Sequence, residues 1–520
     1  MRPALRLAEV VAALSLATDL GMGQPLEFAL SSCVLAVRLG ETLQLNDVEL
    51  REVYYQALLR YIGCNAETHT LAALVGDELA LRRDFATIDN GSMPAVAGLM
   101  LRYLRAASAG VPAIERGRLM AHGLMTMSQV AHDGFVSHCE VAQRLATRLG
   151  LGGGSVQALG QLYERWDGRG QPTGLKGDEI ARSVRIVSLA QDAAIFHRIE
   201  GPEAAIAVVR KRRGTAYDPQ IADRFCETAP RLLAGLEGEP AWDTVVALEP
   251  GQPIILSEEQ FDTACAAMAD FADIKSPFTL AHSHGVARLA AAAAHGSGLP
   301  ETDVVMIRRA GLLHDLGRVS VSAGIWSKPG PLTEREWEHV RLHPYYTERV
   351  LNRPAALAAL GALAGCHHER LDGSGYHRGA RAATLPATAR ILAAADAYQA
   401  MTEARPHRPA RSDDEAAREL EREARAGRLD ADATRAVLAA AGHGVRRSAG
   451  DLTAGLTPRE VEVLRLISRG RSTKEIAREL FIAEKTADNH IQHIYAKIGV
   501  TTRAGAALFA VEHQLLDITA

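Results

Sequence analysis

The chain has 520 residues, of which 47% are hydrophobic, 23% charged and 5% aromatic. This length suggests several domains, and the hydrophobic fraction excludes a wholly disordered chain. With 58 basic and 62 acidic residues the net charge is −4, so any contact with nucleic acid must come from a local basic patch. The six cysteines are scattered without a CxxC pair. This favours a cytoplasmic location and excludes a disulfide framework.

Apolar residues recur at helical spacing along almost the whole chain, and we predict an all-α protein. Residues 1–21 predict an amphipathic helix and not a signal peptide, because Glu9 and Asp19 interrupt their apolar stretch. Residues 245–256 are the best candidate for short β-strands. No apolar run is long enough for a transmembrane helix, so we expect no membrane partner.

An internal repeat organises the sequence. Residues 28–64 end in ALLRYIGC, and residues 282–318 end in GLLHDLGR in the same register. Residues 161–191 match residues 366–396 without a gap. We therefore predict two tandem copies of one helical domain, followed by a small third unit. The predicted domain boundaries are 1–235, 260–440 and 452–520.

Histidines and acids gather in the second copy, in blocks reading HSH, HD, HP, HHE and AAD. The five imidazoles and two carboxylates are His282, His314, Asp315, His343, His367, His368 and Asp396. Nitrogen and oxygen ligands without thiolate suit Mn, Fe, Co or Zn. Two such ions can activate a water and stabilise the leaving oxygen of a phosphodiester. We predict two divalent transition-metal ions as cofactors, with their identity left open.

The second copy resembles the HD-GYP subfamily of HD-domain metal phosphohydrolases. The resemblance is carried by HSHGV, LLHDLGR, HHERLDGSGYH and RILAAADAYQAMTEARPHRPA, in the family's order. It implies a helical fold and a dinuclear site that hydrolyses cyclic di-GMP. By motif, the ligands of the first ion would be His282, His314, Asp315 and Asp396. Those of the second, reached by a bridging Asp315, would be His343, His367 and His368.

Three positions depart from the family's pattern. Arg318 stands where the family has a lysine that contacts substrate phosphate; it keeps the charge and offers a forked donor. We predict that Asp315 and Arg318 act in catalysis. His377 replaces the family's proline, and Phe278 replaces an acid found in some members, which argues against a third metal. The ligand is therefore expected to be a cyclic dinucleotide or another phosphodiester.

The first copy lacks this ligand set. The positions that match the seven predicted ligands, in order, are Phe28, Arg60, Tyr61, His138, Leu162, Tyr163 and Gln191. Only His138 can still coordinate a metal, and a single imidazole does not hold a catalytic ion. We therefore predict a degenerate HD domain, which senses a ligand, dimerises or serves as a scaffold.

Helix-capping signals divide the third unit into four short predicted helices. Capping boxes begin at Thr457 and Ser472, and Gly470 closes the first helix. The third helix is expected at about 484–498, with Ala487 and Ile491 facing the core. Two short helices with a tight connection form a helix-turn-helix, whose second helix would enter a major groove.

This unit resembles the LuxR-type DNA-binding domain, matched by LTPREVEVLRLISRGRSTKEIARELFIAEKTADNHIQHIYAKIGVTTRAGA. The resemblance implies that it binds promoter DNA as a homodimer. The side chains predicted to contact DNA are Lys474, Lys485, Thr486, Asn489, His490 and Lys497. A four-helix module for protein interaction is the alternative.

The sequence as a whole predicts a transcriptional regulator whose second HD domain binds metal and senses or hydrolyses a nucleotide phosphodiester. The alternative from another class is a metal-dependent phosphodiesterase with an accessory DNA-binding domain. A sensor that binds metal or nucleotide without turnover is the third possibility.

Overall fold

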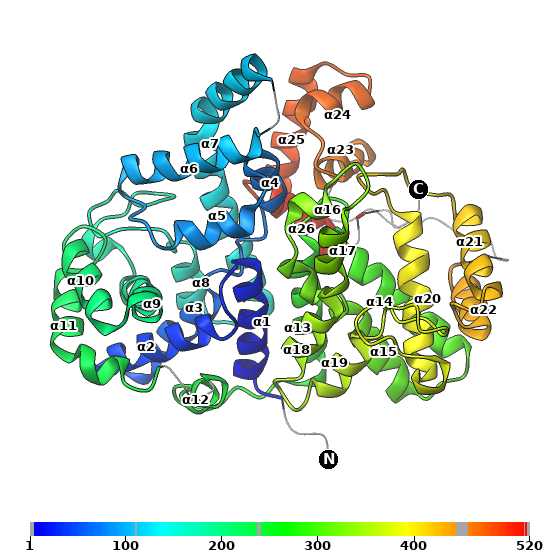
Figure 1. The fold of residues 1–520 in the computed structure, drawn as a ribbon, viewed down its shortest axis with the longest axis horizontal. Coiled ribbons are helices and arrows are strands. Elements are labelled where there is room, and N and C mark those ends of the chain that lie inside the picture. The colour runs from blue at the N-terminus through cyan, green and yellow to red at the C-terminus, as the bar shows by residue number, and fades with distance from the viewer. Residues whose placement is uncertain (1–4, 110–111, 237–240, 444–455, 514, 517–520) are drawn as a thin grey trace. The chain divides into compact units, whose positions relative to one another are not determined.

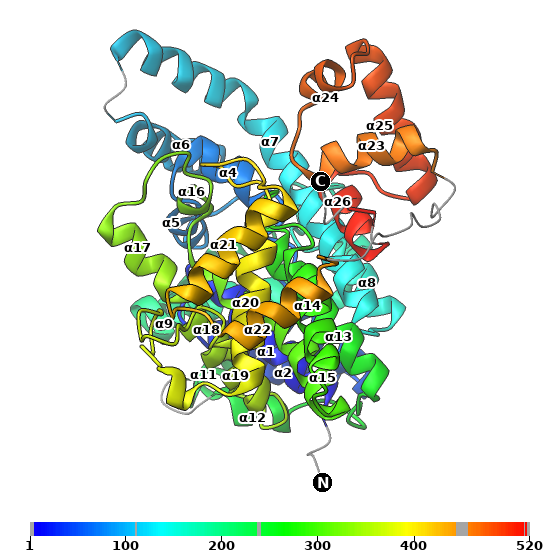
Figure 2. The ribbon, with the colours of Figure 1, turned by 90° about the vertical axis from the view of Figure 1, so that its right-hand side faces the viewer.

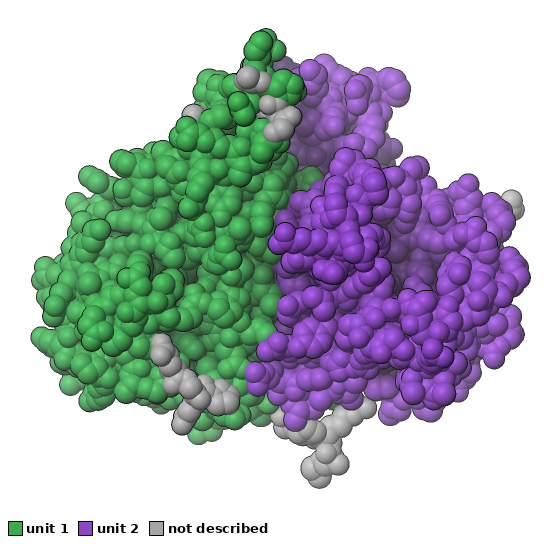
Figure 3. Space-filling model, viewed as in Figure 1, with its two compact units in different colours: residues 1–261 green, residues 262–520 purple. Residues whose placement is uncertain are grey.

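The computed structural model describes residues 5–109, 112–236, 241–443, 456–513 and 515–516. It divides into two compact units, residues 1–261 and residues 262–520 (Figure 3). In the described residues the regular elements are all helices, and β-type pairing is limited to isolated bridges. The prediction of an all-α fold is confirmed.

Unit 1 contains twelve described α-helices (Figure 1). They are α1 (Leu7–Gly21), α2 (Phe28–Thr42), α3 (Asp47–Leu59), α4 (Thr68–Val75), α5 (Glu78–Phe85), α6 (Met93–Ala107), α7 (Ala113–Arg148), α8 (Gly153–Leu159), α9 (Arg182–Glu200), α10 (Pro202–Arg212), α11 (Pro219–Leu233) and α12 (Ala241–Ala247). The core of the unit forms where α2 packs against both α3 and α9.

Unit 2 begins within α13 (Glu258–Asp273). It continues through α14 (His282–Gly296), α15 (Glu301–Leu313), α16 (Ala323–Trp326), α17 (Glu334–Arg341), α18 (His343–Leu351), α19 (Ala358–Ala364), α20 (Ala387–Thr402), α21 (Asp413–Arg425) and α22 (Ala431–Ala440). Here α14 packs against α15, α20 and α22 (Figure 2).

The helices of the two copies begin at register-equivalent residues. The starts of α2 and α3 match those of α14 and α15, and the start of α9 matches that of α20. The residue before α2, Glu27, has φ +73°, and its equivalent before α14, Ala281, has φ +62°. Such left-handed conformations are uncommon for residues other than glycine, so their recurrence marks one shared backbone design.

Buried acids repeat in the same way. Asp19 accepts the backbone N–H of Ala29 at 3.1 Å, and Asp273 accepts that of Ser283 at 2.9 Å. Each acid thereby satisfies a backbone donor in the first turn of the following helix, where four N–H groups lack intrahelical partners. The two copies thus share both their helices and the polar contacts that join them.

Two predictions of local structure are wrong. Residues 7–21 form a helix, but almost every side chain is buried, Asp19 included, so the helix is not amphipathic. Part of the segment predicted as strands, 245–256, instead lies in α12. β-type pairing occurs there only as one isolated bridge between Arg6 and Ile255.

The C-terminal helices are α23 (Pro458–Ser468), α24 (Thr473–Glu479), α25 (Glu484–Ile498) and α26 (Arg503–Glu512). Both predicted capping boxes are present, at Thr457 and Ser472. Gly470 has φ +75° after α23, the left-handed conformation that glycine adopts without steric cost. The core of this small bundle contains Leu464, Ile476 and Ile494.

Candidate metal centre

Five segments of unit 2 bring the seven predicted ligands together. His282 begins α14, His314 and Asp315 follow α15, His343 begins α18, His367 and His368 follow α19, and Asp396 lies within α20. All are buried except His368, whose side chain is 22% exposed. All of these residues except Asp396 lie at or next to a helix end, so short turns fix the positions of the imidazoles.

The ligand atoms fall into two groups. One comprises His343, His367 and His368, the other His282, His314 and Asp315, and within each group the ligand atoms lie within 4.8 Å of one another. Asp396 adjoins both, with Oδ1 3.2 Å from His282 Nε2 and Oδ2 3.5 Å from His368 Nδ1.

Asp315 faces both groups with different oxygens. Its Oδ1 lies 3.3 Å from His343 Nε2 and 3.6 Å from His367 Nε2. Its Oδ2 lies 3.4 Å from His314 Nε2. A carboxylate with one oxygen toward each group has the orientation required to bridge two ions.

Backbone carbonyls fix the orientation of three imidazoles. The Nδ1 atoms of His314, His343 and His367 lie 2.8, 2.6 and 2.7 Å from the carbonyl oxygens of the residues three positions earlier. An Nδ1 beside a carbonyl oxygen must carry the proton, so in the neutral ring Nε2 is an acceptor. This is the arrangement that proteins use to hold metal-binding histidines.

The inward-facing nitrogens lack donors. His343 Nε2 and His367 Nε2 are only 3.0 Å apart, although both are acceptors in these tautomers. His314 Nε2 is buried and has no hydrogen-bond partner within the described structure. Buried acceptors without donors are costly, and a cation between them removes this cost. The residues present therefore fit divalent metal ions.

The charges around the centre are uneven. Burial opposes a charge on His282, but the neighbouring carboxylates of Glu403 and Asp396 outweigh it and raise the pKa of His282 to about 10. Burial and the nearby imidazoles His314 and His343 lower the pKa of His367 to about 3. Burial also opposes the charge of Asp315, yet Arg318 and His314 hold its pKa well below the usual range.

Sequence reasoning missed Glu403. Its Oε2 lies 2.9 Å from His282 Nδ1, and its other oxygen accepts a hydrogen bond from Gln399. Glu403 is the extended residue that ends α20, so it does not share a helical face with Asp396. Helical spacing therefore gave no signal for it in the sequence. A carboxylate bound to the far nitrogen of a histidine orients the ring and increases its basicity toward a metal.

Arg318 lies at the centre but is engaged there. Its Nη1 donates to Asp315 Oδ2 at 2.7 Å, and its guanidinium lies 4.1 Å from the centroid of the Trp326 ring. Tyr376, from the loop after the paired histidines, packs its ring 4.3 Å from that of His368. Arg318 and Tyr376 therefore border the ligand set with a cation and a phenol.

In the first copy, side chains that contact other protein groups occupy the positions equivalent to the ligands. His138 Nδ1 lies 3.3 Å from the hydroxyl of Tyr163, and burial lowers the pKa of His138 to about 3. Arg60 donates to Ser188 Oγ at 3.1 Å. No group of three metal-ligating side chains occurs among the described residues of unit 1.

The loop of the first copy keeps its shape nevertheless. Glu164 accepts the backbone N–H of Thr173 at 2.8 Å, as its equivalent Glu369 accepts that of Arg378 at 3.1 Å. The chemistry has changed while the backbone contacts that shape the loop remain.

The predicted DNA-contacting side chains lie mostly on the surface of the C-terminal bundle. Lys474, Lys485, Thr486, Asn489 and Lys497 are exposed, and His490 is half-buried. Ala487 and Ile491 are buried in the core as predicted. Lys497 Nζ lies 2.7 Å from Glu460 Oε2, so part of its charge is compensated within the bundle.

Fold and site together define a helical protein with a buried cluster of candidate metal ligands in its second copy and a small helix-turn-helix bundle near its C-terminus. The HD domain family model matches residues 120–221 and 266–433, so the chain belongs to the HD-domain family. The model of bacterial regulatory proteins of the luxR family matches residues 454–510. The predicted resemblances are thus confirmed.

Relatives support this assignment. The chain is 30% identical over 415 residues to the 3'3'-cGAMP-specific phosphodiesterase 3 of Vibrio cholerae serotype O1, covering 79% of this chain and 89% of the relative. It is 38% identical over 142 residues to a cyclic di-GMP phosphodiesterase of Thermotoga maritima, covering 27% and 39%.

A solved structure of a cyclic GMP-AMP-specific phosphodiesterase of V. cholerae matches with a TM-score of 0.59 and 26% identity, covering 84% of this chain and 98% of that one. In the described part of the chain, no helix has the length and apolarity needed to cross a membrane. The chain thus joins HD domains, whose relatives are cyclic dinucleotide phosphodiesterases, to a C-terminal domain of the luxR family of bacterial regulatory proteins.

Proposed function

We propose that the second copy binds two divalent transition-metal ions and hydrolyses a phosphodiester bond of a cyclic dinucleotide. The observation that carries this proposal is the pair of buried acceptors, His343 Nε2 and His367 Nε2, 3.0 Å apart with their other ring nitrogens held by carbonyls. Only a positive charge between these atoms relieves their repulsion.

Each residue has a role in this proposal. One ion would be held by His282, His314, Asp315 and Asp396, and the other by Asp315, His343, His367 and His368. When bound, two such ions supply a hydroxide at neutral pH and stabilise the leaving oxygen. Arg318 orients a phosphate oxygen of the substrate through its forked donor. Tyr376 borders the pocket beside His368.

The substrate class is inferred from the relatives. The relative that matches most of its own length is named for hydrolysis of 3'3'-cGAMP, and others for hydrolysis of cyclic di-GMP. Both substrates are cyclic dinucleotides joined by two phosphodiester bonds. We propose that this chain acts on the same class.

The test is metal analysis followed by turnover. Full-length protein reconstituted with Mn²⁺ and passed through a desalting column should retain close to two ions per chain. Incubation with 3'3'-cGAMP and with cyclic di-GMP, followed by chromatography, should yield a linear dinucleotide from at least one of them. Protein that retains no metal contradicts the whole proposal.

A second candidate is a sensor without turnover. It is favoured by one observation, the engagement of Arg318 by Asp315 and Trp326, which leaves the guanidinium tied within the protein. Retention of two ions and saturable binding of a cyclic dinucleotide, without linear product, would identify this sensor. Product formation with DNA binding unaffected by metal or nucleotide would instead identify an enzyme with an accessory DNA-binding domain.

We propose that α25 reads promoter DNA through its N-terminal half and that the protein binds as a homodimer. Asparagine pairs with adenine by two hydrogen bonds, and such a contact is worth about 1–3 kcal/mol. Asn489→Ala should therefore reduce discrimination between specific and mutated sites. Lys485→Ala should weaken all sites alike and lower the salt slope by about one, as expected for a phosphate contact.

Fluorescence anisotropy with the protein's own promoter measures both effects, and light scattering measures the dimer. Lys497→Ala is the matched control because its ammonium already lies beside Glu460. A larger loss for Lys497→Ala than for Lys485→Ala would contradict the proposed orientation of the helix on DNA.

A further inference from the structure

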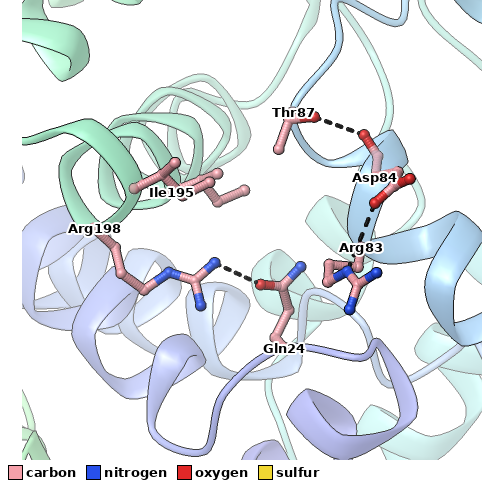
Figure 4. A pocket seen from close by; sticks show the side chains of 7 residues that line it. Gln24, Arg83, Asp84, Thr87, Ile195 and Arg198 are labelled. Carbon is pink, nitrogen blue, oxygen red and sulfur yellow. Dashed lines mark hydrogen bonds and ion pairs between the residues drawn. The ribbon is translucent and has the colours of Figure 1, made fainter.

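A pocket of about 430 Å³ opens in unit 1 (Figure 4). Its lining comes from the loop after α1, from α5 with the turn that follows it, and from the end of α9. The lining residues are Gln24, Arg83, Asp84, Thr87, Ile195, Arg198 and Ile199. This volume falls within the usual range of small-molecule sites.

The repeat identifies the residues of the second copy that are equivalent to the pocket residues. In register, Arg198 is the equivalent of Glu403, and Phe28 is the equivalent of His282. The second copy therefore pairs a carboxylate with an imidazole, 2.9 Å apart. The first copy pairs a guanidinium with a phenyl ring, 5.2 Å from the ring centroid. An anionic support for a metal ligand has been replaced by a cation.

The pocket wall carries a second arginine near Arg198. Gln24, the equivalent of Phe278, accepts a hydrogen bond from Arg198 at 3.0 Å. Figure 4 shows the guanidinium of Arg83 on the other side of Gln24. Two arginines from different elements thus converge on one amide side chain.

The acid in the pocket is largely neutralised. Asp84 accepts hydrogen bonds from Arg102 at 2.6 Å and from the Tyr103 hydroxyl at 2.9 Å. Arg83 contacts it only at 3.6 Å, and the Arg83 side chain remains 61% exposed. The deeper acid, Asp19, is buried beneath α2 and bound to a backbone N–H. The net charge presented to the pocket is therefore positive.

We infer that this pocket binds a small phosphate-bearing ligand of nucleotide size. Guanidinium groups match the oxygens of a phosphate with two parallel hydrogen bonds. The Thr87 hydroxyl already donates to the carbonyl oxygen of Asp84 at 2.8 Å, so the arginines are the donors, while Ile195 and Ile199 supply an apolar wall for the remainder of the ligand. The degenerate copy is thus a binding domain for an anion. This inference does not depend on turnover in the second copy.

The experiment compares GMP with guanosine, which differ by one phosphate. The full-length protein is first treated with a chelator, which removes metal-dependent binding to the second copy. Isothermal titration then measures the affinity of the protein for each ligand. We expect GMP to bind at least about tenfold more tightly than guanosine, the difference that one charge-assisted contact provides. Added salt should weaken the binding of GMP but not that of guanosine.

Variants locate the site. Arg83→Gln and Arg198→Gln should each weaken GMP binding by about tenfold or more. Arg224→Gln, which removes an exposed arginine of α11 paired with Glu227 at 3.4 Å, should leave GMP binding unchanged. Arg198 packs on the ring of Phe28, so Arg198→Gln can also disturb folding. The Arg83 side chain is 61% exposed, so Arg83→Gln tests the site with less risk to the fold.

Three results overturn the inference. They are equal affinity for GMP and guanosine, absence of binding by millimolar GMP, and GMP binding by Arg83→Gln that matches the parent protein. Activity of the second copy is measured on the same preparations. Loss of GMP binding with retained hydrolysis supports this site separately from the proposed enzyme, and failure of both assays in the parent protein refutes both proposals.

Discussion

The two copies of the HD domain share a backbone but not a chemistry. In one, Asp315 and the imidazoles around it form a buried cluster whose acceptors face one another. In the other, Tyr61 and Leu162 fill equivalent positions, and His138 is held by Tyr163. The shared helices begin at equivalent residues whether or not a ligand stands there, and the backbone contacts of Asp19 and Asp273 do not involve the ligands. Fold and metal chemistry are therefore separable in this architecture.

The largest effect is expected at the bridging carboxylate. Asp315→Ala should remove most of both metal ions, because each of its oxygens faces a different ligand group. Tyr61→Ala, the change at the equivalent position of unit 1, should leave metal content unchanged. Elemental analysis of both purified variants provides the measurement. An Asp315→Ala protein with the full metal content would refute the proposed bridge.

A pair of histidines gives the next contrast. His343→Ala should lose about one ion per chain and all phosphodiesterase activity, since His343 belongs to only one ligand group. His138→Ala should retain both ions and activity but lower the free energy of unfolding by about 1–3 kcal/mol, because it removes a buried ring and its contact with the Tyr163 hydroxyl, which keeps only Cys64 Sγ at 3.1 Å. Metal content and thermal unfolding separate the two variants. Metal loss from His138→Ala would mean that the first copy contributes to the centre.

The charge reversal between Glu403 and Arg198 predicts a smaller change. Glu403→Gln should weaken metal binding about 10- to 100-fold, the usual cost of removing a group that orients a ligand. Arg198→Gln should not alter metal affinity. Competition with a fluorescent chelator measures both affinities. Equal metal affinity in Glu403→Gln and the parent protein would show that carbonyl-held histidines suffice for the centre.

Much of this comparison was predictable from sequence because ligands and helix caps are local signals. The blocks HD and HHE place two ligands side by side, and the capping boxes at Thr457 and Ser472 specify helix starts within a few residues. Two segments of the repeat, each aligned without an internal gap, then identify the replaced ligands of the first copy without knowledge of the fold.

The features that escaped prediction depend on tertiary surroundings. The helix at 7–21 contains charged residues, yet nearly all of it is buried, and Asp19 is accommodated there by the backbone N–H of Ala29. The role of Glu403 follows from the position of His282, which is far away in sequence. The pocket beside Arg83 arises from α5, an insertion that has no counterpart in the second copy.

The smallest effect concerns the link between the copies and DNA. A ligand shifts DNA affinity only if it binds the DNA-competent arrangement more or less tightly than the alternative, and such couplings amount to about 1–3 kcal/mol. If the second copy supplies the signal, metal and cyclic dinucleotide should change promoter affinity in the parent protein and in His138→Ala, but not in Asp315→Ala. If the pocket of the first copy supplies it, GMP should change promoter affinity in Asp315→Ala and fail to do so in Arg83→Gln. Anisotropy titrations of the four proteins on one promoter, with and without each ligand, distinguish these outcomes. Promoter affinity that is constant across all of them would show that the DNA-binding domain acts independently of both copies, because linkage requires that a coupled ligand and DNA affect each other equally.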